Sequence, residues 1–280
     1  MQRLPEYLKR PIINTEKTHT VRKILKNKCL NTVCEDARCP NKSECYSKNT
    51  ATFLIMGNIC TRNCRYCNIK TSKPESLDIN EPKHLAEAVR DLDLKYVVIT
   101  SVTRDDLPDG GAVHFSNCIK EIRKVDKEIK IEILTPDFKA DKKALDIIIK
   151  SNPDVFNHNI ETVKTLFKTA RPQGNYDVSI DVLRYIKEKS NIITKSGLMV
   201  GLNENWDEIE ETLMDLKNAE VDIITIGQYI QPSKEHLTAA KYYTIDEFEK
   251  LRTLAKKIGF NNYQIGPLVR SSYNAAQLAK

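Results

Sequence analysis

Short apolar runs recur along the chain from residue 52 onward, with amphipathic segments between them. The runs are rich in valine, isoleucine and threonine, which are residue types that favour β-strands. We therefore expect six strands, at residues 52–59, 96–102, 130–135, 155–159, 195–200 and 222–230.

The intervening segments carry apolar residues at three- and four-residue spacing, which is typical of helices with one buried face. Thr244 and Glu247 precede the last of these segments at the spacing of a capping box. We expect a helix near residues 20–28 and further helices along the stripes at 85–92, 112–122, 206–216 and 248–258.

Strands that alternate with helices every ~30–40 residues predict right-handed βαβ units and a parallel sheet. This pattern alone leaves an α/β doubly wound sheet and an α/β barrel both open. In either fold, reactive residues gather at the carboxyl ends of the strands. We expect an N-terminal extension at residues 1–50, the α/β domain at 51–260 and a C-terminal tail at 261–280.

Composition narrows the class of protein. The 280 residues are 40% hydrophobic and 29% charged, with a formal net charge of +6. No run approaches the ~18 apolar residues of a membrane span, and the first residues lack the apolar region of a signal peptide. We expect a cytoplasmic protein that acts neither at a membrane nor on nucleic acid, because no run of lysine and arginine is long enough for the latter.

Seven of the eight cysteines fall between residues 29 and 67. Disulfide frameworks belong to small secreted domains, whereas clustered cysteines in a cytosolic protein indicate metal ligands. Cys118 lies apart from them in an amphipathic segment, and we expect it in the core.

One cysteine group is Cys60, Cys64 and Cys67, with Tyr66 before the last thiol. Tetrahedral zinc needs a fourth ligand, and none of the five histidines is near in sequence. Three thiolates suit a [4Fe–4S] cluster that keeps one iron open.

The other group is Cys34, Cys39 and Cys45, and Cys29 precedes it at the same spacing that separates Cys34 from Cys39. A second iron–sulfur cluster on three thiolates is one interpretation. A structural zinc held by all four thiolates is the other, and spacing alone does not decide between them.

With these motifs the chain resembles the lipoyl synthase family of the radical S-adenosylmethionine superfamily over nearly its whole length. The resemblance implies a partial (β/α)6 barrel of the TIM type. The matching segments are residues 32–41, 57–67, 100–112, 157–162, 171–172, 197–201 and 270–273, the last reading Arg-Ser-Ser-Tyr.

The resemblance also implies two [4Fe–4S] clusters with different roles. The radical cluster is held by Cys60, Cys64 and Cys67, and its open iron binds S-adenosylmethionine, which is split to a 5′-deoxyadenosyl radical. The auxiliary cluster is held by Cys34, Cys39 and Cys45 and is completed by a serine of the tail, for which Ser272 is favoured over Ser271. Cys29 lies outside the family motif.

Weaker expectations concern contacts to S-adenosylmethionine, and a cap or turn role is the alternative for each residue. The resemblance places Thr100 and Ser101 at the methionyl amine, Asn159 and Glu161 at the ribose, Gly197–Gly201 with Glu204 at the adenine, and Arg171 and Lys195 at the carboxylate or the carrier. Asn203 and Asn274 depart from the family pattern, which has glycine and often histidine there.

The activity so implied is a sulfurtransferase reaction on octanoyl-lysine. The hydrogens at C6 and C8 are not acidic, so a radical rather than a base must remove them. A serine oxygen is a hard ligand on iron that prefers thiolate, so the auxiliary cluster can come apart and yield two sulfurs.

The implied partners are octanoylated lipoyl domains, such as the H protein of glycine cleavage and the E2 subunits of 2-oxoacid dehydrogenases, with a flavodoxin or ferredoxin as reductant and a carrier that repairs the cluster. Alternatives are a biotin-synthase-like enzyme, an RNA methylthiotransferase, and a zinc-stabilised binding protein without redox chemistry.

Overall fold

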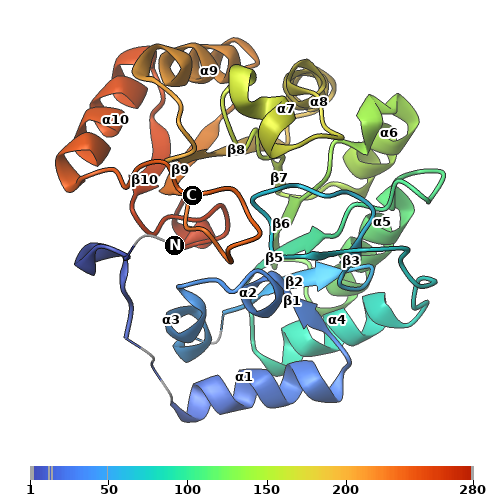
Figure 1. Ribbon diagram of the computed structural model, residues 1–280. Helices are drawn as coiled ribbons and strands as arrows, with labels where there is room; N and C mark the ends of the chain where they lie inside the picture. Colours follow the sequence, from blue (N-terminus) through green and yellow to red (C-terminus); the bar gives the residue numbers. More distant parts are fainter. Residues whose placement is uncertain (1–2, 12, 14, 49, 279–280) are drawn as a thin grey trace. The chain divides into compact units, whose positions relative to one another are not determined.

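The computed structural model describes residues 3–11, 13, 15–48 and 50–278 (Figure 1), so the outermost ends of the expected extension and tail lie outside the described residues. The chain forms two compact units. Residues 10–62 and 69–156 make up the first, called here the N-terminal unit. Residues 1–9, 63–68 and 157–280 make up the second, called the C-terminal unit.

The N-terminal unit is built on three parallel strands, β2 (Thr52–Ile55), β5 (Tyr96–Ser101) and β6 (Lys130–Leu134), paired in that order. The two-residue strand β1 (Asn31–Thr32) runs antiparallel to β2. A separate short pair, β3 (Ile59–Cys60) and β4 (Lys70–Thr71), carries the first cysteine of the Cys60–Cys67 motif.

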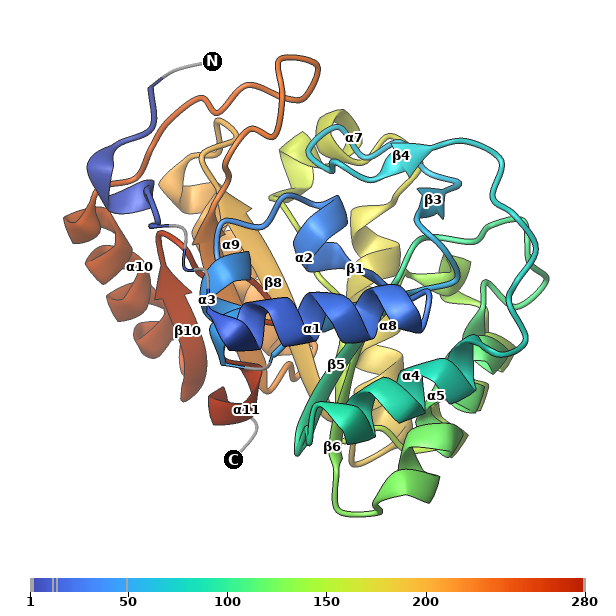
Figure 2. The same cartoon turned by 90° about the horizontal axis from the view of Figure 1, so that it is seen from below.

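Helices of the N-terminal unit pack against one another along this sheet. Helices α4 and α5 lie side by side (Figure 2), and both bury an apolar face that includes Leu85, Val89, Phe115 and Ile119. The helices are α1 (Glu16–Asn27), α2 (Val33–Asp36), α3 (Lys42–Ser47), α4 (Glu81–Asp91), α5 (Ala112–Val125), the 3-10 turn η2 (Phe138–Ala140) and α6 (Lys142–Ser151).

The C-terminal unit holds a second parallel group, β8 (Ile193–Val200), β9 (Ile223–Gln228) and β10 (Asn262–Gly266). Strand β9 is buried along its whole length, as expected of a central parallel strand covered on both faces. Its helices are η1 (Glu6–Leu8), η3 (Lys164–Leu166), α7 (Phe167–Ala170), α8 (Tyr176–Lys189), α9 (Trp206–Asn218), α10 (Ile245–Ile258) and α11 (Ala275–Leu278). Strand β7 (Val155–Asn157) lies where the two units meet in sequence.

Most of the expected elements are present, with different ends. The first strand stops at Ile55 rather than at residue 59, because Met56 (φ 66°) and Gly57 (φ 85°) are left-handed and turn the chain. Helix α1 begins at Glu16, four residues before the expected start, because Thr15 caps it in a reciprocal pair with Thr18.

Other elements were not expected from the sequence. Helices α6 and α8 and strand β10 had no counterpart, and β10 lies inside the segment expected to be a tail. The capping box of Thr244 and Glu247 at the start of α10 is confirmed, as is the burial of Cys118 in α5. None of the described helices is long and apolar enough to cross a membrane.

Candidate active site

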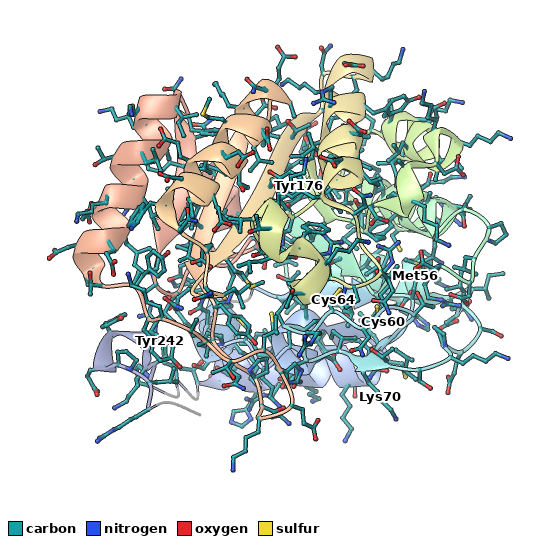
Figure 3. The ribbon with its side chains drawn as sticks, turned by 45° about the horizontal axis from the view of Figure 1, so that its top comes forward. Met56, Cys60, Cys64, Lys70, Tyr176 and Tyr242 are labelled. Carbon is teal, nitrogen blue, oxygen red and sulfur yellow. The ribbon has the colours of Figure 1, made fainter. Side chains whose placement is uncertain are left out.

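Cys60 ends the short strand β3 in the N-terminal unit, on the segment that begins at Met56 (Figure 3). Its Sγ accepts hydrogen bonds from the backbone N–H of Arg62, at 3.4 Å, and of Thr103, at 3.3 Å. Backbone donors aimed at a ligand sulfur fix its orientation and tune a metal that it binds. Cys60 is thus presented as a ligand with its own hydrogen-bond support.

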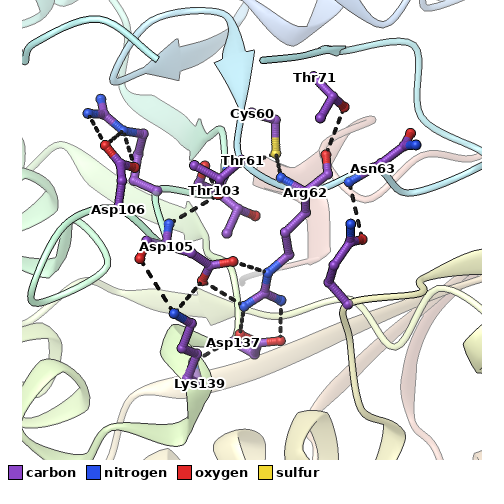
Figure 4. A network of polar contacts seen from close by, with 12 residues as sticks. Cys60, Thr61, Arg62, Asn63, Thr71, Thr103, Asp105, Asp106, Asp137 and Lys139 are labelled. Carbon is purple, nitrogen blue, oxygen red and sulfur yellow. Dashed lines mark hydrogen bonds and ion pairs between the residues drawn. The ribbon is translucent and has the colours of Figure 1, made fainter. Parts of the chain in front are cut away.

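Arg62, two residues further on, is clamped between two carboxylates (Figure 4). Its Nε and Nη2 donate to the two Asp105 oxygens at 2.7 and 2.9 Å, and its Nη1 and Nη2 donate to the two Asp137 oxygens at 2.6 and 2.7 Å. Burial alone would lower the pKa of Arg62, but the bonds from Asp137 and Asp105 outweigh it and raise that pKa. The guanidinium is therefore a fixed cation that ties the cysteine segment to the loops after β5 and β6.

Thr61 adds a second tie between the same segments. Its Oγ1 donates to the Thr103 carbonyl at 2.9 Å and accepts from the Asp105 N–H at 3.1 Å. Sequence reasoning assigned no role to Arg62, Asp105 or Asp137. The only available signal was that both aspartates closely follow strands.

Thr100 and Ser101 end strand β5, where a parallel sheet presents reactive groups. Thr100 Oγ1 donates to the Leu134 carbonyl at 2.9 Å, so its hydroxyl is engaged within the sheet. Ser101 Oγ is buried and has no hydrogen-bond partner among the described residues. A buried hydroxyl without a partner is costly, so Ser101 is the better fit to a bound polar ligand.

The N-terminal cysteines Cys34, Cys39 and Cys45 lie close enough to affect one another's ionisation. Burial, together with the charges of Cys39 and Cys45, raises the pKa of Cys34 to about 12. Burial and the charge of Cys39 raise the pKa of Cys45 to about 11. Cys29 is exposed. The three thiols of the family motif therefore form one electrostatic group.

Local hydrogen bonds build this group from short helices. Thr32 caps α2, which carries Cys34, and the Cys39 N–H donates to the Cys34 carbonyl at 3.2 Å. The Cys45 N–H donates to the Asn41 carbonyl at 2.9 Å in α3. Within the described part of the chain, no three histidine, cysteine or carboxylate side chains are already arranged as ligands of one metal ion.

Cys64, Tyr66 and Cys67 belong to the C-terminal unit. The Cys67 N–H donates to the Cys64 carbonyl at 3.0 Å, which closes a tight turn. Burial, then the charge of Glu161, raises the pKa of Tyr66 well above its usual value. Tyr66 is thus a neutral, half-buried ring that lies between Cys64 and Cys67 in sequence.

A loop that follows β9 holds this turn in place. His236 Nε2 lies 2.9 Å from the Cys67 carbonyl oxygen, and since a carbonyl can only accept, this nitrogen carries the proton. The Ser233 hydroxyl lies 2.8 Å from Nδ1, which is then the acceptor. The Leu237 N–H also donates to the Arg65 carbonyl at 3.0 Å. Sequence reasoning missed His236 because it lies far from the cysteines along the chain.

Asn159 and Glu161, expected near the ribose, are joined to each other. Asn159 Nδ2 donates to Glu161 Oε1 at 3.2 Å, and Ser271 Oγ of the tail donates to Asn159 Oδ1 at 2.9 Å. Burial raises the pKa of Glu161, although Arg171 and Asn159 act in the opposite direction. The tail motif and the expected ribose contacts thus share one network.

Of the remaining expected residues, Arg171 contacts this network directly. Arg171 Nη1 donates to the Asn159 carbonyl at 3.3 Å, and its guanidinium stacks on the Phe167 ring. Lys195 is fully buried in β8. Glu204 accepts from the N–H groups of Gly201 and Leu202 at 2.6 and 2.8 Å, and so closes the turn after β8. Asn203 adopts φ 89°, which the family's glycine adopts without strain.

Two curated relatives cover almost the whole chain. Lipoyl synthase of Caldicellulosiruptor bescii is 52% identical over 97% of this chain and 94% of that protein. Lipoyl synthase of Caldicellulosiruptor saccharolyticus is 48% identical over 99% of this chain and 97% of that protein. The Radical SAM superfamily profile matches residues 54–216. The chain belongs to the lipoyl synthase family.

This membership establishes the enzyme class and its cofactors. Lipoyl synthases are radical S-adenosylmethionine enzymes that insert sulfur into octanoyl groups on lipoyl carrier proteins, using S-adenosylmethionine and two [4Fe–4S] clusters. The RNA methylthiotransferase, biotin-synthase-like and zinc-binding alternatives are thereby set aside.

The fold class is shown as well. Coproporphyrinogen III oxidase of Escherichia coli, a radical SAM enzyme, superposes with a TM-score of 0.55 at 12% identity, over 74% of this chain and 52% of that chain. The likeness supports the α/β partial barrel over the doubly wound sheet, a choice that the strand pattern had left open.

Proposed function

We propose that Cys60, Cys64 and Cys67 hold the radical cluster of this lipoyl synthase, and that Cys34, Cys39 and Cys45 hold the auxiliary cluster. The family uses two clusters, and the chain has eight cysteines. Cys118 is buried in helix α5. Cys29 is exposed, and it lies outside the family motif. Six thiols in two groups of three remain. The proposed auxiliary site rests on the proximity of Cys34, Cys39 and Cys45, because, in addition to burial, the charge of Cys39 raises the pKa values of the other two thiols.

We propose Ser272 as the fourth ligand of the auxiliary cluster. Ser271 is committed to Asn159 Oδ1 at 2.9 Å and faces Gly197. The hydrogen bonds that join Ser271, Asn159 and Glu161 do not include the Ser272 hydroxyl. Adjacent residues point in different directions, so the engagement of Ser271 supports the assignment of ligand to Ser272.

Bound S-adenosylmethionine supplies the 5′-deoxyadenosyl radical that removes hydrogen from C6 and C8 of the octanoyl chain. The chain's own residues position it. Ser101 offers its buried hydroxyl to the methionyl amine, with Thr100 holding the strand end. Asn159 and Glu161 present an amide and a carboxylate to the ribose hydroxyls.

Cations complete the proposed site. We propose that Arg171, which is fixed on the Asn159 carbonyl and Phe167, and the buried Lys195 attract the methionyl carboxylate. Complete burial of Lys195 favours a small bound molecule over a carrier surface. The Arg62 clamp keeps the Cys60 segment rigid while the radical forms.

We further propose that the substrates are octanoylated H protein and E2 lipoyl domains, in the cytoplasm. A flavodoxin or ferredoxin would supply the electrons, and a cluster carrier would rebuild the auxiliary site. The net charge of +6 supports docking of acidic carriers by long-range attraction.

Iron analysis of anaerobic protein tests the ligand assignment. The wild type should bind about eight irons, as two [4Fe–4S] clusters require. Cys34→Ala and Cys60→Ala should each lose about half of them, whereas Cys118→Ala should lose none. Zinc bound in place of iron at the N-terminal trio would refute the assignment.

An octanoylated peptide separates the two roles. Cys34→Ala should still form 5′-deoxyadenosine but no thiolated peptide, and Cys60→Ala should form neither. Ser272→Ala should retain the first product and lose the second. Normal sulfur transfer by Ser272→Ala would remove Ser272 from the ligand set.

A further inference from the structure

The tail and the expected ribose contacts are connected through one side chain. We propose that Ser271 is a positioning residue for S-adenosylmethionine, and that seating of the tail and binding of S-adenosylmethionine are coupled through Ser271, Asn159 and Glu161. This rests on the proposed function, which gives the ribose to Asn159 and Glu161 and the auxiliary cluster to Ser272.

Ser271 fixes which way the Asn159 amide faces. The hydroxyl donates to Oδ1 at 2.9 Å, so Oδ1 is the acceptor and Nδ2 is turned toward Glu161 Oε1, 3.2 Å away. Without that donor Oδ1 loses its partner, and only the 3.2 Å bond from Nδ2 to Glu161 Oε1 still holds the amide. The orientation of both ribose groups therefore depends on a tail residue.

The backbone beneath this pair is rigid, so the side chains set the remaining freedom. The Glu161 N–H donates to the Gly197 carbonyl and its carbonyl accepts from the Met199 N–H, both at 2.9 Å. The Ile160 N–H donates to Ser196 Oγ at 3.1 Å. Residues 159–161 are thus bound along β8, and only the amide and carboxylate can still turn.

Gly197 shows how closely the tail approaches. A Cβ at this position would lie 2.6 Å from Asn159 Oδ1 and 2.9 Å from both Ser271 Oγ and Thr225 Oγ1. Such distances are far inside van der Waals contact, so only glycine leaves room for Ser271 to reach Asn159.

The tail brings Ser271 to this place on contacts of its own. The Val269 carbonyl lies only 2.1 Å from where a Cβ on Gly227 would be, so the tail presses directly on β9. Arg270 Nη1 donates to the Val269 carbonyl at 2.6 Å, and the Tyr273 N–H donates to the Arg270 carbonyl at 2.9 Å. These bonds form a compact turn that presents Ser271 and Ser272 side by side.

Coupling follows from this adjacency. If Ser272 leaves the auxiliary cluster during sulfur transfer, the same backbone movement withdraws Ser271 from Asn159. The seated tail then strengthens the binding of S-adenosylmethionine by some factor. By thermodynamic linkage, bound S-adenosylmethionine favours the seated tail by the same factor. The net contribution of one hydrogen bond corresponds to a factor of about 3–10 in the binding constant. The enzyme would hold its co-substrate less tightly once the sulfur donor has opened.

Equilibrium binding of S-adenosylmethionine to anaerobic holoenzyme tests this coupling. Ser271→Ala should weaken binding about 3–10-fold and raise KM for S-adenosylmethionine, with 5′-deoxyadenosine formation at saturation nearly unchanged. Ser190→Ala is the matched control, because it removes a similar hydroxyl bond, to the Ile186 carbonyl at the end of α8, away from the site. Binding unchanged within twofold in Ser271→Ala would overturn the proposal.

Hydrogen exchange on the wild-type holoenzyme gives a second readout that needs no variant. S-adenosylmethionine should slow amide exchange in residues 262–273, and this protection should shrink in Ser271→Ala but not in Ser190→Ala. If S-adenosylmethionine leaves the amide exchange rates of the wild-type tail unchanged, the proposed coupling is wrong. Iron content, together with sulfur transfer, distinguishes failure of the Ser271 positioning role from failure of the Ser272 ligand assignment. Loss of four irons by Ser271→Ala would make Ser271 the ligand and defeat this inference, whereas normal sulfur transfer by Ser272→Ala would defeat only the proposed ligand.

Discussion

The clamp on Arg62 makes a quantitative prediction for the substitution Arg62→Met. The methionine keeps the apolar stem but leaves Asp137, whose side chain is 3% exposed, without its cation. Removing one partner of a buried ion pair costs about 3–5 kcal/mol, because the remaining charge stays desolvated. Asp105 is 25% exposed and can turn to water, so it adds little. We expect a loss of about 3–4 kcal/mol in the free energy of unfolding.

Arg104→Met is the matched control in the same unit. Arg104 is as deeply buried as Arg62, and its Nε and Nη2 donate to both oxygens of Asp106 at 2.9 Å. Asp106, however, is 39% exposed, so water can satisfy it once the guanidinium is gone. We expect this variant to lose about 1–2 kcal/mol, mainly through packing and the hydrogen bond to the Met56 carbonyl.

Anaerobic urea unfolding measures both costs, followed by far-ultraviolet circular dichroism and by cluster absorbance. Coincident curves from the two probes justify a two-state free energy. The double variant Arg62→Met/Asp137→Asn removes both charges, so it should be more stable than the sum of the single costs predicts. Equal losses in Arg62→Met and Arg104→Met, or strict additivity in the double variant, would refute the claim that the loss of the cation beside the buried Asp137 sets the cost.

Three further variants test other parts of the structure. Gly197→Ala should displace Ser271 from Asn159 and lower S-adenosylmethionine affinity at least as much as Ser271→Ala does; unchanged affinity would show that the close approach does not matter. His236→Ala removes the donor to the Cys67 carbonyl and should speed iron loss to a chelator several-fold, as expected for a lost hydrogen bond of about 1 kcal/mol, whereas His236→Gln should restore retention in part. Thr244→Ala should destabilise the protein by about 1 kcal/mol through loss of the α10 cap, with Thr244→Ser near wild type in the same urea assay.

Much of the fold was predictable because its signals are local. Tyr96–Ser101 and Ile223–Gln228 each contain four consecutive β-branched residues, and such runs form strands buried on both faces. Strand β10 was not predicted, because Asn262–Gly266 has few apolar residues and begins at an exposed position. The end of β2 was misplaced because the left-handed turn at Met56 has no reliable signature outside glycine.

The proposed ligands could be selected from local spacing, but the groups that position them could not. A cluster draws several thiolates from one short loop, so three cysteines as close in sequence as Cys60, Cys64 and Cys67 predict one. Arg62 meets Asp137 across 75 positions, and His236 meets Cys67 across 169. Nothing in a single sequence pairs residues at such separations, since any buried arginine could take any of the 38 acidic residues.

The two adjacent serines of the tail can be distinguished by their hydrogen bonds but not by their sequence. Ser271 and Ser272 are identical in chemistry and share one motif, so the sequence could only favour one of them by resemblance. The hydrogen bond from Ser271 to Asn159, 112 positions away, separates them physically. A hydroxyl that donates to this half-buried amide has its proton committed, and to bind iron it would have to give that bond up and leave Asn159 Oδ1 without its donor, at a cost of about 1 kcal/mol. Its neighbour carries no such cost, so the same contact supports both proposals, Ser271 as a positioning residue and Ser272 as the ligand.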